Sequence, residues 1–171
     1  MRFNKNVQEI LNKQVNAEFW SAYLYLSMSS YFAQRGLPGF ANWMRIQFQE
    51  ETSHALKIFD YVISRGGEMK LEPIAAVETE WKNPMDVFES TYKHECIVTD
   101  MISNCYEVAV KEKDHATASM LQWFINEQAE EEENALAIID QLKYIGDNGP
   151  ALLLLDKELA TRVFVDATKT V

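Results

Sequence analysis

The sequence contains few residues that interrupt helices, and this scarcity restricts the fold. Its 171 residues include only six glycines and four prolines, whereas β-rich domains use many of both in their turns. Residues that favour helices, chiefly Ala, Leu, Glu, Lys and Met, are plentiful instead. The length suits one domain with a full-sized hydrophobic core. We therefore expect a single all-α domain over residues 1–171.

Three further absences restrict the location and the partners of the protein. The first ten residues, MRFNKNVQEI, contain no apolar segment of the kind that secretory signals carry. The longest strongly apolar run, ALLLL at 151–155, is too short to span a bilayer. Positive charge is scarce, and the net charge of −10 disfavours nucleic acid and favours cations as partners. We predict a cytoplasmic protein that binds neither nucleic acid nor a membrane.

Cysteine is scarce as well. Cys96 and Cys105 lie nine residues apart, about 13 Å along one predicted helix, which is too far for a disulfide between them. We expect two free thiols in a reducing compartment, packed as small apolar side chains.

Helical periodicity occupies most of the chain, in four long segments. They run over about 6–34, from the break at 35–39 to about 65, from 83 to about 111, and from 114 to about 145. Asn83 followed by Pro84 indicates one helix start, and Asp114 indicates another. Gly146 indicates a helix end. A shorter fifth helix is expected over about 150–165.

The lengths of the connections predict the topology. The joints within each pair of helices are short, so each pair forms an antiparallel hairpin. Between the hairpins lie about seventeen residues, GGEMKLEPIAAVETEWK. A helix of 27 residues is about 40 Å long, and a linker of this length extends to roughly 55–60 Å. The expected fold is a four-helix bundle with one long crossover between helices 2 and 3, followed by the short fifth helix.

Each long helix carries an acid in the middle of a stripe that otherwise indicates core. Glu51, for example, shares its stripe with Met44, Ile58 and Val62. A lone buried carboxylate costs several kcal/mol unless it is neutralised, paired or bound to metal. The corresponding acids of the other three helices are Glu18, Glu95 and Glu131.

The spacing of these residues is matched between the two hairpins. The first hairpin reads E-x32-E-x-x-H and the second reads E-x32-Q-x-x-E; the residues are Glu18, Glu51 and His54, then Glu95, Gln128 and Glu131. Antiparallel folding brings both sets to one level of the bundle. About four negative charges in a core of low dielectric would take up protons, whereas two divalent cations would offset them. Oxygen-rich ligation with one imidazole favours iron or manganese over structural zinc.

Several stretches resemble the bacterial non-haem ferritins: NAEFWSAYLYLSM, FQEETSHALKIFDYVISRGG, TYKHE, WFINEQAEEE, IDQLKYIG and LDKELA. The resemblance covers nearly the whole chain, and ferritin-like di-iron bundles share this layout of acids. It implies an iron storage protein with ferroxidase activity, which oxidises Fe(II) with oxygen or peroxide and stores the ferric product as mineral.

The resemblance also implies roles for single residues. The first iron of a di-iron centre would bind Glu18, Glu51 and His54. The second would share Glu51 as a bridge and add Glu95, with Gln128 nearby. The resemblance places Tyr25 close to the centre and Glu131 beside the pair of irons. Glu131 would link the pair to a third iron position, together with Glu50, Glu127 and Glu130.

Two departures distinguish this chain from the haem-containing relatives. Residues 128–131 read QAEE where bacterioferritins have a second E-x-x-H, and Thr52 stands where they have a haem-binding methionine. We therefore expect no haem.

The fifth helix indicates assembly. Its four adjacent leucines, residues 152–155, face all round a helix, so some must contact another element or chain. In ferritins the matching helix lines a channel of a hollow shell of about 24 subunits, so the resemblance implies a homo-oligomer with closed symmetry.

Other interpretations remain open at this stage. The chain could be a di-iron oxidase or peroxidase for another substrate, a subunit that assembles without oxidising iron, or a metal-free structural bundle with protonated acids. Glu50, Glu127 and Glu130 could belong to a solvated face, and Tyr25 could be a packed aromatic residue.

Overall fold

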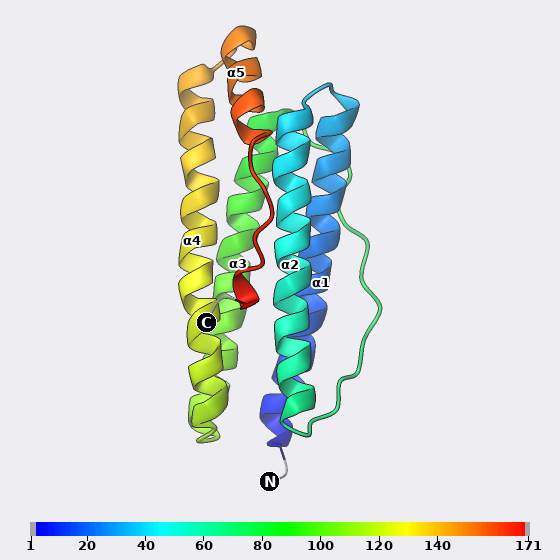
Figure 1. The fold of residues 1–171 in the computed structure, drawn as a ribbon, viewed down its shortest axis with the longest axis vertical. Helices are drawn as coiled ribbons and strands as arrows, with labels where there is room; N and C mark the ends of the chain where they lie inside the picture. Colours follow the sequence, from blue (N-terminus) through cyan, green and yellow to red (C-terminus); the bar gives the residue numbers. More distant parts are fainter. Residues whose placement is uncertain (1–2, 170–171) are drawn as a thin grey trace.

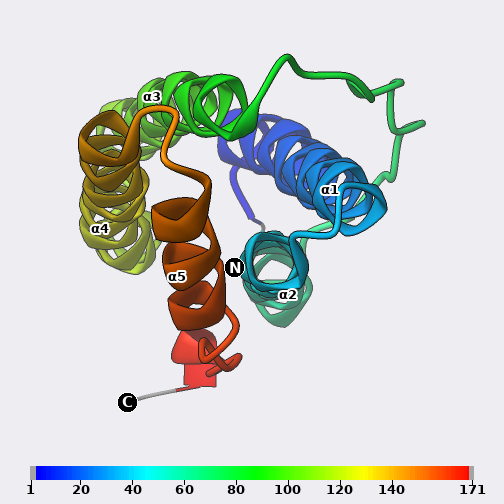
Figure 2. The same cartoon turned by 90° about the horizontal axis from the view of Figure 1, so that it is seen from above.

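The computed structural model describes residues 3–169 and is all-helical over that range (Figure 1). Its elements are α1 (Lys5–Gln34), α2 (Pro38–Ser64), α3 (Pro84–Lys111), α4 (His115–Ile145), α5 (Gly149–Leu159) and the 3-10 turn η1 (Ala167–Lys169). The first four helices form the bundle, and α5 lies between α2 and α4 at one end (Figure 2). The predicted fold class is therefore confirmed. None of the helices in this range is both long and apolar enough to cross a membrane.

The predicted helix boundaries correspond to hydrogen-bonded caps. The Asn83 side chain accepts a hydrogen bond from the backbone N–H of Asp86 at 2.9 Å, and Asp114 accepts one from Thr117 at 3.1 Å. Gly146 follows α4 with a φ of 52°, in the left-handed region that glycine tolerates. Short polar side chains and one glycine thus set these helix ends.

The crossover, residues 66–82, runs back along α1 (Figure 1). Polar side chains on one face of α1 hold its backbone. Asn12 donates to the carbonyl of Glu68 at 3.1 Å and accepts from the N–H of Lys70 at 2.8 Å. Asn16 and Trp20, one and two turns further on, donate to the carbonyls of residues 72 and 76. The crossover is therefore anchored along α1 by hydrogen bonds between α1 side chains and its own backbone.

Helix α5 ends at Leu159, so the predicted extension to about residue 165 is wrong. Asn42 of α2 donates to the carbonyls of Leu159 and Arg162, at 3.2 and 3.0 Å. These bonds hold the backbone after the helix against α2, and the exposed β-branched Val163 and Val165 favour an extended chain. Tertiary contacts therefore replace the next helical turn.

Helix α5 is fixed against the start of α2 at a point of close backbone approach. Leu37 provides no side-chain cap for α2, and Asp156 of α5 accepts from the N–H of Phe40 at 2.9 Å instead. A Cβ atom on Gly39 would lie 1.5 Å from the carbonyl oxygen of Asp156. Only glycine permits this contact, so Gly39 determines how α5 docks.

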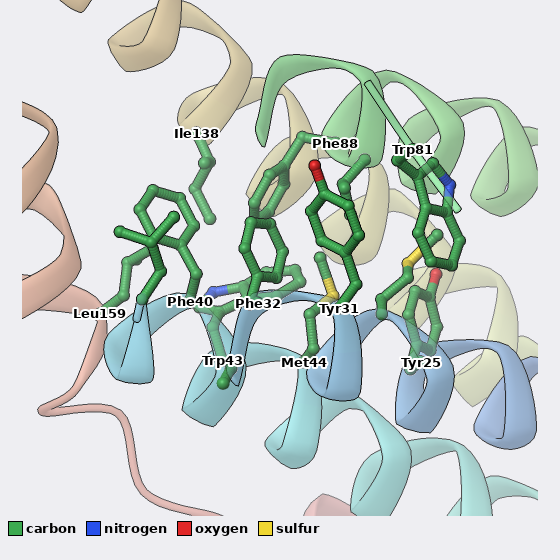
Figure 3. Packing of buried hydrophobic residues seen from close by; sticks show 14 of the residues in the cluster. Tyr25, Tyr31, Phe32, Phe40, Trp43, Met44, Trp81, Phe88, Ile138 and Leu159 are labelled. Carbon is green, nitrogen blue, oxygen red and sulfur yellow. The ribbon is translucent and has the colours of Figure 1, made fainter. Parts of the chain in front are cut away.

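The hydrophobic core consists of two clusters with a polar layer between them. The cluster near α5 is rich in aromatic side chains, including Phe32, Phe40, Trp43 and Phe88 (Figure 3). The other cluster is mainly aliphatic and lies toward the opposite end of the bundle. Between the two, every long helix contributes buried polar side chains. The candidate site occupies this layer.

Candidate metal centre

Six of the predicted site residues are buried together in the polar layer. Each is at most 4% exposed; they are Glu18, Glu51, His54, Glu95, Gln128 and Glu131. Helical register places them there, since the acids follow the core stripes of their helices at matched depth. Such a concentration of carboxyl groups in a core needs protons or cations to neutralise it.

Glu18, Glu51 and His54 form the first group of potential ligands. Their ligand atoms all lie within 4.8 Å of one another, and Nδ1 of His54 is 3.7 Å from Oε2 of Glu51. Within the described residues, the Oε2 atoms of Glu18 and Glu51 are buried without a hydrogen-bond partner. Unpaired carboxylate oxygens beside an imidazole suit a hard divalent cation.

Glu95 lies beside this group and is oriented from two other helices. The Tyr25 hydroxyl on α1 donates to Oε1 of Glu95. Gln128 on α4 donates to Oε2 of Glu95 at 3.1 Å and to its backbone carbonyl at 3.3 Å. Tyr25 is thus more than a packing residue, because its hydroxyl fixes a carboxylate of the centre.

A second group of potential ligands adjoins the first through His54. The ligand atoms of His54, Glu127 and Glu131 lie within 4.8 Å of one another, with Nε2 of His54 3.9 Å from Oε1 of Glu127. Gln47 of α2 donates to Oε2 of Glu131 at 2.8 Å. His54 therefore faces one group of acids with each ring nitrogen.

The two remaining predicted ligands are not part of these groups. Glu50 forms an ion pair with Arg162, with 2.6 Å between Oε2 and Nη2. Glu130 is exposed at the surface of α4. Of the four acids implied for a third iron position, the structure brings together Glu127 and Glu131 only.

The electrostatics of the centre favour uptake of positive charge. Burial, followed by the charges of Glu95, Glu18 and Glu131, raises the pKa of Glu51 well above its usual value. Burial raises the pKa of Glu95 to about 7, although hydrogen bonds from Tyr25 and Gln128 oppose the shift. Burial and the charges of Glu95 and Glu50 raise the pKa of Glu131 to about 8. Without metal, the centre therefore retains protons at neutral pH.

This distribution of pKa values predicts a pH-dependent stability. Below about pH 4.5, the usual glutamate pKa, these carboxyls are protonated in both the folded and the unfolded chain. As the pH rises, the unfolded chain loses these protons first, while folded Glu95 and Glu131 retain theirs until about pH 7 and 8. The free energy of unfolding of the metal-free protein should therefore fall across this window. Thermal melting between pH 5 and 8 measures it.

The same protons must leave when metal binds. Titration calorimetry with Zn(II) in buffers of different ionisation enthalpy should therefore detect proton release, and affinity should weaken as the pH falls below about 8. The double variant Glu95→Gln/Glu131→Gln should flatten the pH dependence of melting. A melting temperature of the metal-free protein that rises from pH 5 to 8 would contradict this account.

Two glutamines that bind acids of the centre, Gln14 and Gln47, were not predicted from the sequence. Gln14 donates to Oε1 of Glu18 at 2.7 Å, and its own Oε1 lies 3.8 Å from the thiol of Cys105. Burial raises the pKa of Cys105 to about 12, so the thiol remains a donor and orients the amide. Gln14 and Gln47 each stand four residues before an acid of the centre, Glu18 and Glu51. That spacing on a core stripe was the available signal.

Replacing Gln14 tests whether this amide positions Glu18. Gln14→Met keeps the volume but removes the donor, so Glu18 should lose its fixed orientation and metal affinity should fall by about 10–100-fold. Zn(II) titration of the metal-free protein measures this change. The control is Gln122→Met on the exposed face of α4, which should leave affinity unchanged. Equal affinity in the two variants would mean that Glu18 needs no support from Gln14.

Fold and site together define a class: a four-helix bundle with a buried carboxylate and imidazole centre that could hold two hard cations. The family described as a ferritin-like domain matches residues 8–145. A bacterial non-heme ferritin of Bacteroides fragilis is 43% identical over 159 residues, 93% of this chain and 99% of its own. One from Staphylococcus haemolyticus is 40% identical, covering 94% and 97%.

Solved structures agree with these relatives. An engineered closed form of Archaeoglobus fulgidus ferritin superposes with a TM-score of 0.95 at 51% identity, covering 96% of this chain and all of that one. The open-pore ferritin of the same archaeon gives 0.93 at 51% identity, covering 94% and 98%. The chain belongs to the ferritin family.

Proposed function

We propose that this protein stores iron and acts as a ferroxidase at the buried centre. The observation that carries the proposal is a pair of buried oxygens beside the His54 ring, Oε2 of Glu18 and Oε2 of Glu51, that lack a hydrogen-bond partner within residues 3–169. Buried acids with spare lone pairs destabilise an empty core, so their retention favours a site built for cations.

Iron is the substrate and the cargo of this reaction. Glu18, Glu51 and His54 bind one Fe(II); Glu51 and Glu95, with Gln128 nearby, bind the second. Two Fe(II) release one electron each, which with two protons reduce dioxygen to hydrogen peroxide, or reduce peroxide to water. Carboxylate oxygens are hard donors and favour the ferric product. Tyr25 and Gln128 keep Glu95 in place throughout.

The second group of ligands gives the product a route out of the centre. His54 contacts both groups, so Glu127 and Glu131 form a third iron position one step from the first. Glu50 and Glu130 lie further out, and we place them along the path to the mineral. The acidic net charge of −10 suits a surface on which cations collect.

We further propose that the chain assembles into a homo-oligomeric shell of about 24 subunits in the cytoplasm. In the described chain Leu153 is 54% and Leu154 68% exposed on α5, which agrees with the expectation that some leucines of this helix contact another chain. Exposed apolar side chains of this kind mark interfaces.

Oxidation of another substrate finds less support. A cavity of about 720 Å³ lies between α1 and the crossover, and a smaller one lies near the start of α5. No residue of the centre lines either of them, so neither gives an organic molecule access to the metals.

Stopped-flow oxidation of Fe(II) tests the proposed activity. The fast phase of ferric absorbance after adding Fe(II) to the metal-free protein in air should be complete at about two iron atoms per chain. Oxidation no faster than in protein-free buffer would contradict it.

A further inference from the structure

The segment that follows α5, residues 160–169, lies over the seam between α2 and α4 (Figures 1 and 2). Neighbouring side chains hold it there. Asn42 binds its first turn, as described above, and Nζ of Lys57 donates to the carbonyl of Thr168 at 3.2 Å. Both ends of the segment are therefore tied to α2.

Within this segment, the positively charged side chain of Arg162 contacts α2. Its Nη2 lies 2.6 Å from Oε2 of Glu50, and its Nη1 donates to the carbonyl of Trp43 at 3.4 Å. The guanidinium carbon also lies 4.6 Å from the centre of the Trp43 ring. Stacking and hydrogen bonds together give the guanidinium one preferred position.

The partner of Arg162 lies at the edge of the second group of ligands. Glu50 stands four residues before His54 on α2, so the two side chains share one face of the helix. A turn of its side chain would direct Glu50 toward a metal ion held by His54, Glu127 and Glu131, yet its Oε2 is occupied by Arg162. A fixed cation and a metal ion compete for the same carboxylate.

We propose that the guanidinium of Arg162 competes with a metal ion for the Glu50 carboxylate. It keeps Glu50 from the third metal position and so weakens metal binding there. While the ion pair is closed, an ion beside His54, Glu127 and Glu131 lacks Glu50 as its third acid. When the ion pair is open, Glu50 turns to the metal and the position becomes tight. This inference rests on the proposed function, since it assumes that the two groups of ligands bind metal.

Calorimetric titration of the metal-free, assembled protein with Zn(II), which cannot be oxidised, tests this competition. The native protein should bind two ions tightly and a third weakly. Arg162→Gln should tighten the third site on the order of tenfold, the effect of freeing a charged group from a hydrogen bond. Arg162→Lys keeps the cation and should remain close to native. Arg45→Gln, on the exposed face of α2, removes the same charge elsewhere and should change nothing.

A second substitution locates the effect. In a Glu50→Gln background the third site should be weak, and adding Arg162→Gln should no longer tighten it. A gain that persists without Glu50, or an unchanged third site in Arg162→Gln, would overturn the inference while the two tight sites keep the proposed function intact. If the native protein binds no Zn(II), and Glu18→Ala changes nothing, the proposed function and this inference fall together.

Discussion

Glu51→Gln is expected to abolish rapid iron oxidation while making the metal-free protein more stable. Glu51 adjoins Glu18 and His54, is 1% exposed, and has an oxygen without a hydrogen-bond partner among the described residues. An amide keeps the shape of the side chain but removes the charge that would bridge two ions. The oxidation rate should therefore fall by at least about 100-fold, because losing a ligand exceeds the effect of losing its support.

The opposite change in stability has the same cause. Burial and three neighbouring acids raise the pKa of Glu51, so this carboxyl opposes folding without metal. Its removal should raise the melting temperature of the metal-free protein by roughly 2–8 °C, corresponding to about 1–2 kcal/mol. Glu89→Gln, exposed on α3, is the control for charge. A variant that oxidises iron at the native rate, or that melts lower than the native protein, would contradict the role assigned to Glu51.

Gly39→Ala is expected to detach α5 and prevent assembly. The added Cβ would stand 1.5 Å from the carbonyl oxygen of Asp156. Because that oxygen belongs to the backbone, no rotation of a side chain can relieve the clash. Overpacking costs about 1–3 kcal/mol where side chains adjust, and a backbone clash costs more. The hydrogen bond from Phe40 to Asp156 would be lost at the same time.

The bundle itself should survive this substitution, because four long helices retain both core clusters. Circular dichroism should therefore remain helical while the particle mass falls. Gly149→Ala is the matched control, since in the described part of the chain no neighbouring atom lies within 4 Å of its added Cβ. Normal assembly of Gly39→Ala would show that docking of α5 against α2 is not needed for the shell.

The sequence predicted the bundle well because its signals are local. Asn83, Asp114 and Gly146 act on the backbone within a few residues, and the structure places their caps where expected. Helical register likewise placed Glu18, Glu51 and their partners at one depth. Periods of 3.6 residues and matched hairpins require no knowledge of distant contacts.

The features that were missed depend on contacts between distant parts of the chain. The pair of Arg162 and Glu50 joins residues 112 positions apart, and the Asn42 bonds that hold the chain after Leu159 against α2 span more than 110 positions as well. In the sequence, Asn12 and Asn16 look like any other polar residues of α1, because their hydrogen-bond partners lie in the crossover, 56 positions away. Gln14 could have been noticed on its core stripe, but its bond to Glu18 needs side-chain geometry.

Iron retained per chain after aerobic loading with Fe(II), with particle mass read on the same size-exclusion run, tests the central claim most directly. We expect a large particle that retains iron far beyond about two atoms per chain, which requires both oxidation and storage. Retention that stops near two atoms per chain on a small oligomer would contradict storage, and the absence of retained iron would contradict the metal centre itself.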